Sequence, residues 1–98
     1  YRHALFFAHL AVEKVLKAFV VRATSDIPPR IHNLVRLAEL SELSLQPERT
    51  VSLKELNIYQ MAGRYPDADS LDIPREIAFK EMSSAKEMFE WLKGQLSV

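Results

Sequence analysis

The hydrophobic positions at the start of the chain recur with the spacing of a helix. Residues 2–22 contain no Gly or Pro, and strong helix formers dominate them. At about 100° per residue, this segment has two apolar faces on nearly opposite sides. The first face consists of Leu5, Val12, Leu16, Phe19 and Val20, and the second of Ala4, Phe7, Ala11 and Ala18. A helix that is apolar on two sides needs partners on both, so we expect it at the centre of a bundle.

The middle of the chain predicts two shorter helices. Pro28 and Pro29 end the first helical segment, because proline cannot continue a helix. Leu34, Leu37 and Ala38 have the spacing of a buried helical face, which predicts a second helix over residues 31–43.

A third helix is expected to end at Gly63, and its start has two candidates. Ser52-Leu53-Lys54-Glu55 has the Ser-x-x-Glu form of a capping box, although Glu48 is an earlier alternative. A polar stretch from Arg64 to Ser70 then predicts a loop.

A fourth helix is predicted from Pro74, which suits a first helical turn, to about Leu96. Four helices with short connections and no repeats predict one all-α domain over residues 1–98. We expect an antiparallel up-and-down helical bundle.

Composition and charge exclude several kinds of function. The chain has no cysteine, so disulfides, thiolate metal sites and cysteine nucleophiles are absent, and its three scattered histidines do not predict a metal centre. No cofactor motif is present either. No apolar run is long enough for a membrane span and no signal pattern is visible, so we expect a cytoplasmic protein. Thirteen basic side chains balance thirteen acidic ones, which leaves no overall field to attract nucleic acid.

A polar stripe separates the two apolar faces of the first helix. Arg2, His9, Glu13 and Lys17 fall within a sector of about 80°. One interpretation is that these side chains pair with one another at a partly covered edge. The other is that they form the floor of a polar groove, in which His9 carries a proton and Lys17 contacts phosphate.

Three side chains of the last helix depart from a simple amphipathic pattern. Glu81 falls inside the apolar arc, where a buried carboxylate needs a partner, and we expect His9 or an arginine. Internal pairing is a more common role for such a carboxylate than catalysis. Trp91 and Phe79 project away from the arc, which suggests a dimer contact or a covering segment.

Two places have the chemistry of an anion site. Arg64 and Tyr65 stand in a proline-stiffened turn after Gly63 and form a stacking and anion-binding surface, although the end of a helix alone favours a cation there. Arg30 and His32 stand at the start of the second helix, where backbone N–H groups attract anions. The alternative there is a cap-and-turn role.

Several segments together resemble the HEPN domain family (higher eukaryotes and prokaryotes nucleotide-binding). Residues 1–18 are similar to the signature helix of that family and read YRHALFFAHLAVEKVLKA. Pro29-x-x-His32-Asn33-Leu34-x-x-Leu37 resembles its next helix, and Tyr59 with Arg64-Tyr65-Pro66-Asp67 resembles its helix-to-loop segment. The resemblance implies an all-α bundle, usually with one more helix before Tyr1, and frequently a homodimer. It also implies nucleotide or RNA binding, often with a minimal nucleotidyltransferase as partner.

The resemblance carries over a set of binding residues and leaves catalysis open. Ligand-binding roles fall on Glu13, Lys14, Lys17, His32, Arg64, Tyr65 and Asp67. RNases of the family carry an Arg-x4-6-His motif, but no histidine follows His32 in this sequence. Arg2 and His9 have that spacing on the signature helix, which is the wrong place for the motif. No catalytic residue is therefore assigned.

Three hypotheses follow. The first is a dimeric, non-catalytic nucleotide- or RNA-binding module of a toxin–antitoxin-like pair with a nucleotidyltransferase. The second is a metal-independent RNase toxin, with His9 or His32 as acid or base and Arg64 on the phosphorane. The third is a structural dimerisation module, in which the polar residues are interface pairs.

Overall fold

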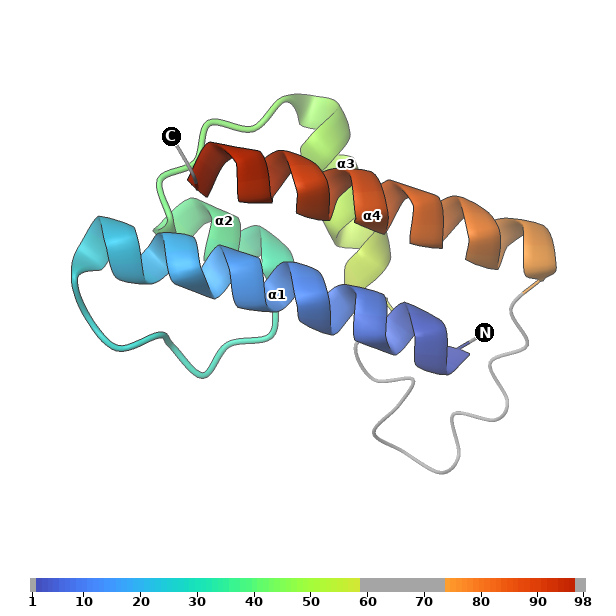
Figure 1. Ribbon diagram of the computed structural model, residues 1–98, viewed down its shortest axis with the longest axis horizontal. Coiled ribbons are helices and arrows are strands. Elements are labelled where there is room, and N and C mark those ends of the chain that lie inside the picture. The colour runs from blue at the N-terminus through green and yellow to red at the C-terminus, as the bar shows by residue number, and fades with distance from the viewer. Residues whose placement is uncertain (1, 59–73, 97–98) are drawn as a thin grey trace.

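The computed structural model describes residues 2–58 and 74–96, and these residues form four helices (Figure 1). They are α1 (Arg2–Thr24), α2 (Leu34–Leu40), α3 (Pro47–Asn57) and α4 (Arg75–Leu96). The described residues contain no strand, and the all-α helical bundle is confirmed. The predicted end of the third helix at Gly63 and the predicted loop after it lie outside the described residues.

The helices are not all antiparallel to their neighbours. α1 and α4 lie side by side and run in the same direction (Figure 1), and the Arg22 guanidinium near the end of α1 donates to the Leu96 carbonyl at 3.3 Å. α3 runs against α4, because Arg49 at its start pairs with Glu87 at 3.5 Å while Glu55 lies beside Glu81. The expected antiparallel order therefore holds for α3 and α4. The connection over residues 25–33 returns along α1 and allows the parallel arrangement of α1 and α4.

The core is built on the first apolar face of α1, as predicted. Every residue of that face is buried, and α1 contacts α2, α3 and α4. The other helices add to the same core the side chains of Leu34, Leu37, Ala38, Leu53, Leu56, Ala78, Ala85, Met88 and Leu92. Each buried leucine contributes about 1.5–3 kcal/mol, so this cluster supplies most of the driving force for folding.

The second apolar face of α1 is not covered, contrary to the expectation of partners on both sides. Phe7 is 63% exposed, and Ala4, Ala11 and Ala18 are only half-buried. The branched and aromatic side chains of the first face gain more from burial than alanines do, so the other helices pack against that face. The second face forms one wall of an open groove beside α4.

Local capping explains where the central helices differ from their predicted bounds. Asn33 is the N-cap of α2, and its Oδ1 accepts from the backbone N–H groups of Val35 and Arg36, so the helix begins three residues later than predicted. Glu42 has a φ of 61°, a left-handed conformation that ends the helical path early. Ser52 is no cap, because α3 begins at Pro47 and the Ser52 hydroxyl donates to the Glu48 carbonyl at 3.1 Å. The earlier of the two predicted starts is therefore the better one.

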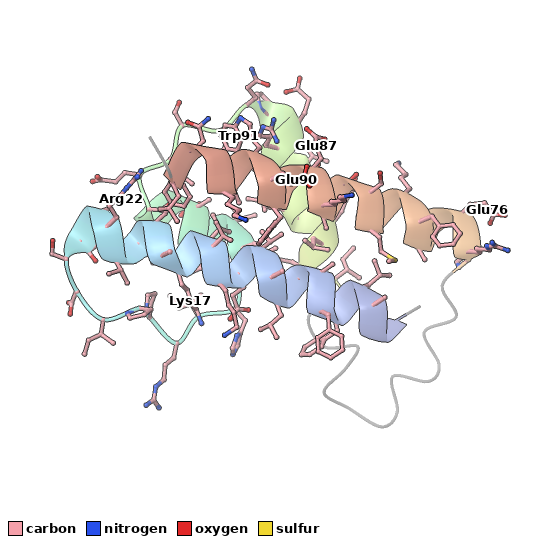
Figure 2. All side chains as sticks on the ribbon, viewed as in Figure 1. Lys17, Arg22, Glu76, Glu87, Glu90 and Trp91 are labelled. Carbon is pink, nitrogen blue, oxygen red and sulfur yellow. The ribbon has the colours of Figure 1, made fainter. Side chains whose placement is uncertain are left out.

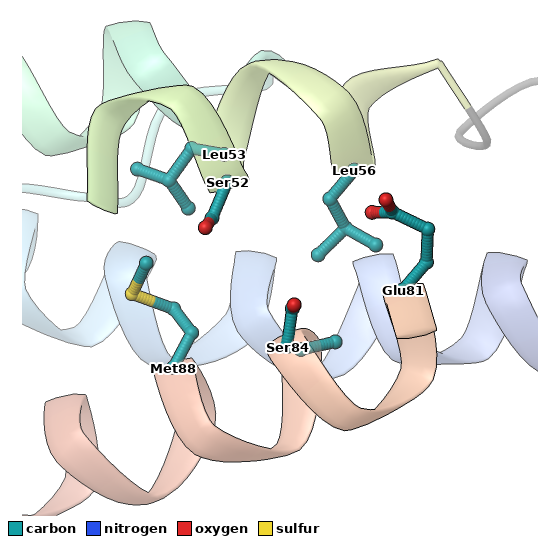
Figure 3. A pocket seen from close by; sticks show the side chains of 7 residues that line it. Ser52, Leu53, Leu56, Glu81, Ser84 and Met88 are labelled. Atoms are coloured by element: carbon teal, nitrogen blue, oxygen red, sulfur yellow. The ribbon is translucent and has the colours of Figure 1, made fainter. Parts of the chain in front are cut away.

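Glu81 is buried between α3 and α4, as predicted, but its expected partner is wrong. Its carboxyl group faces Glu55 of α3 rather than His9 or an arginine, and Figure 3 shows it beside Leu56. Burial, the hydrogen bond with Glu55 and repulsion from Glu55 together raise the pKa of Glu81 to about 7, and Lys80 opposes them. Two neighbouring carboxylates avoid repulsion by sharing a proton. Glu81 is therefore paired inside the protein, as expected, but with another carboxyl group instead of a cation.

Trp91 is half-buried against α3, so the interpretation that it faces solvent is wrong. The Arg49 guanidinium lies 4.1 Å from the centre of its ring, and Figure 2 shows Trp91 on the same side of α4 as Glu87, the ion-pair partner of Arg49. Phe79 is exposed as predicted, with the Arg75 guanidinium 5.1 Å from its ring centre.

The Glu81 site predicts a pH-dependent gain in stability for Glu81→Gln. Because the pKa of Glu81 is raised on folding, its contribution to stability is complete below about pH 4.5 and is lost as the pH rises through about 7. Glu81→Gln keeps a neutral hydrogen-bonding group at every pH. We expect its free energy of unfolding to exceed that of the wild type by about 1–2 kcal/mol at about pH 8, and the difference to vanish near pH 5.

Urea unfolding at several pH values measures this difference, with Glu90→Gln as the control, since Glu90 is exposed on the same helix. A Glu81→Gln variant less stable than the wild type at high pH would contradict the shared-proton pair.

Candidate functional site

The polar stripe of α1 is centred on one buried carboxylate, that of Glu13. The Glu13 side chain is 3% exposed, and its Oε2 accepts from Lys17 Nζ at 2.9 Å and from His32 Nδ1 at 3.0 Å. Its other oxygen, Oε1, lies 3.6 Å from His9 Nδ1 and has no hydrogen-bond partner. Burial alone would raise the pKa of Glu13, but the hydrogen bonds from Lys17 and His32 outweigh it and hold the pKa below its usual value. The carboxylate is therefore ionised at neutral pH.

The Glu13 cluster consists of Glu13, His9, Lys17 and His32. Asn57, at the end of α3, connects this cluster to α2 and α3. Its Oδ1 accepts from the backbone N–H of Leu34 at 2.9 Å and lies 3.3 Å from His9 Nε2. Its amide nitrogen donates to Asn33 Oδ1 at 3.0 Å. Asn57 was not among the predicted site residues, because its role depends on the close approach of three helices. The available signal was a polar side chain four residues after the core residue Leu53.

His9 is a structural histidine. It is 1% exposed, and burial lowers its pKa despite the opposing effects of Glu13, Asn57 and the backbone of His32. A ring so deeply enclosed cannot meet a substrate, and it is neutral at pH 7. Of the two interpretations of the stripe, internal pairing is the one that fits His9, and the role of proton carrier does not.

The start of α2 does not offer its first backbone N–H groups to an anion. Its backbone N–H groups already have acceptors within the protein: Asn57 Oδ1 takes that of Leu34, and Asn33 Oδ1 takes those of Val35 and Arg36. These three backbone donors are used within the protein, which fits the alternative of a cap-and-turn role.

Lys17 and His32 form the accessible edge of the cluster. Their side chains are 21% and 41% exposed, and they come from α1 and from the segment before α2. Figure 2 shows Lys17 on the side of α1 that faces the connection over residues 25–33. The Lys17 ammonium has three donors, of which Glu13 takes one. Lys17 can therefore donate hydrogen bonds to an anionic group while the buried carboxylate fixes its position.

The structure brings together only some of the predicted site residues. Glu13, Lys17 and His32 are in direct contact. Lys14 is exposed and follows Phe7 by seven residues, so it lies on the second apolar face of α1. The predicted residues Arg64, Tyr65 and Asp67 lie outside the described residues.

Metal and membrane sites find no support in the part of the chain that the structure describes. Over residues 2–58 and 74–96, no three His, Asp or Glu side chains are arranged to hold a metal ion. None of the described helices combines the length and apolar character needed to cross a membrane.

The bridging position of Asn57 predicts a large loss of stability for Asn57→Ala. The substitution leaves the Leu34 N–H and the His9 ring without an acceptor in a buried place, which costs about 2–3 kcal/mol. Chemical denaturation measures the change, and Gln95→Ala, which removes an exposed amide from α4, serves as the control. If both variants lose less than about 0.5 kcal/mol, Asn57 does not hold the cluster together.

Comparison with known proteins identifies the family of this bundle. A family model described as the HEPN domain matches residues 1–95. Comparisons with curated proteins and with solved structures gave no significant match. The matched region covers α1, α2, α3 and α4 up to residue 95, together with the Glu13 cluster, as the resemblance in the sequence predicted. The chain belongs to the HEPN domain family.

Proposed function

We propose that this HEPN domain is a non-catalytic module that binds a nucleotide or the phosphates of RNA at the edge formed by Lys17 and His32. The observation that carries the proposal is the geometry around Glu13. One oxygen of a buried carboxylate holds two partly exposed, nitrogen-bearing side chains from separate elements. Membership in the HEPN family supports a nucleotide- or RNA-related role.

Preorganisation is the physical advantage of this arrangement. A free lysine loses up to about 2 kcal/mol of side-chain entropy when it is fixed on a ligand. Lys17 is already held by Glu13 at 2.9 Å, so much of that loss occurs on folding rather than on binding. The Lys17 ammonium contacts the phosphate as a compact charge. The His32 ring is held next to it, because its Nδ1 lies 3.0 Å from the same Glu13 oxygen.

The remaining predicted contacts complete the proposed site. Lys14 supplies a further cation at the surface of α1, and the family resemblance assigns Arg64 to phosphate, Tyr65 to stacking on a base, and Asp67 to the same loop. The proposal further includes a cytoplasmic homodimer that acts with a minimal nucleotidyltransferase in a toxin–antitoxin-like pair. Family membership is the support for these partners.

The RNase hypothesis has weaker support. His9, one of its two candidate acid–base residues, is too deeply buried to reach an RNA strand.

Isothermal titration calorimetry with ATP, GTP and a short single-stranded RNA at moderate salt tests the binding role. We expect binding by at least one of them. Lys17→Ala/His32→Ala removes two preorganised contacts and is expected to weaken that binding by tenfold or more, since a hydrogen bond to a charged group contributes about 1.5–3 kcal/mol. The control is Lys54→Ala, which removes an exposed cation from α3 and should leave the affinity unchanged.

Absence of heat with all three ligands, or equal binding by the double variant and the control, would reject the proposed site. Circular dichroism of each variant shows whether the fold is retained.

A further inference from the structure

A second surface of the domain meets the proposed binding site at Lys14 and otherwise lies apart from it. It is an apolar groove of about 500 Å³ between α1 and α4, on the side away from the Glu13 cluster. Its lining residues are Ala4, Phe7, Ala8, Ala11, Met82, Ser83, Ala85, Lys86 and Phe89. Small side chains form its floor, and Phe7, Met82 and Phe89 are its large apolar walls. Phe7 is 63% exposed, so much of the apolar surface of the groove is in contact with water.

Basic side chains surround this groove. Lys86 lines it, and Lys93 Nζ lies 6.0 Å from the ring centre of Phe89. Lys14 follows Phe7 by seven residues along α1 and is exposed on the same face. On α4, Arg75 precedes Met82 by seven residues and lies over the exposed ring of Phe79. Among the described residues of this face, Glu90 is the acidic one, so positive charge dominates the rim.

We propose that this groove binds an amphipathic helix of a partner protein whose apolar face is flanked by acidic residues. The lining positions on α1 run from Ala4 to Ala11, a rise of about 10 Å, which corresponds to two turns of a bound helix. Because the floor of the groove consists of alanines, the helix of the partner can approach closely and place its apolar ridge between α1 and α4. Carboxylates on the flanks of that helix then meet Lys14 on one rim and Lys86 and Lys93 on the other.

The charge pattern favours this occupant over a second copy of the chain. A symmetric dimer through the groove would bring two basic rims against each other, and like charges in an interface oppose association. An RNA strand would use the basic rim but would leave the apolar floor without a partner.

Fluorescence anisotropy with a labelled helical peptide tests the proposal. The probe is a designed peptide of about 16 residues, with leucines on one face and glutamates on both flanks, and its control has lysines in place of the glutamates. We expect the acidic peptide to bind the whole domain and the basic peptide to bind at least tenfold more weakly. Affinity for the acidic peptide should fall as NaCl rises from about 50 to about 300 mM.

Two pairs of variants connect this binding to the groove. Lys86→Glu/Lys93→Glu reverses two exposed rim charges and is expected to weaken binding of the acidic peptide by tenfold or more. Lys54→Glu/Lys80→Glu makes the same change in charge at exposed positions outside the groove and should retain most of the affinity. Ala11→Glu places a charge in the groove and should abolish binding.

Several results would overturn the proposal. They are absence of binding at about 100 μM peptide, equal binding of the two peptides, and equal weakening by the two double variants. Sedimentation that shows a dimer broken by Ala11→Glu would identify a second copy as the occupant instead. Tight binding to vesicles of phosphatidylcholine and phosphatidylglycerol, lost in Ala11→Glu, would identify a lipid surface.

Discussion

The burial of an ionised carboxylate is the constraint on which the middle of this domain depends. Glu13 lies on the helix that contacts all the others, and a charge removed from water there must be satisfied by donors from the protein. Lys17 supplies one donor from the same helix, and His32 supplies the other from the segment before α2. The need to satisfy one side chain thus fixes where the connection over residues 25–33 crosses α1.

The same network fixes the helices behind it. Asn57 accepts the first N–H of α2 and contacts His9, so the end of α3, the start of α2 and the middle of α1 share one set of polar contacts. Because the interior polar groups are occupied in this way, Lys17 and His32 form the more exposed edge around Glu13. The apolar groove lies elsewhere, between α1 and α4. The domain therefore has two separate surfaces with different chemistry, one polar and one apolar with a basic rim.

Sequence patterns predicted the elements of the fold better than their arrangement. The spacing of Leu5, Val12 and Leu16 identified the buried face of α1, because helical periodicity is a local property. The same logic predicted that Glu81 is buried. The pairing of Glu81 with Glu55 and the stacking of Arg49 on Trp91 depend on how α3 crosses α4. A local sequence pattern carries no information about that crossing. Asn57 was missed for the same reason. The cap at Asn33 makes α2 begin later than the spacing of its apolar residues predicted.

A double-mutant cycle between Glu13 and His32 tests the central claim most directly. Urea unfolding of Glu13→Gln, His32→Ala and the double variant gives the coupling energy between the two side chains. Because they belong to separate elements and meet at 3.0 Å, we expect about 1–2 kcal/mol of coupling. The exposed pair of Arg36 and Glu39, also 3.0 Å apart, serves as the reference and should give about 0.5 kcal/mol or less. Additive effects of the Glu13 and His32 substitutions would contradict the account.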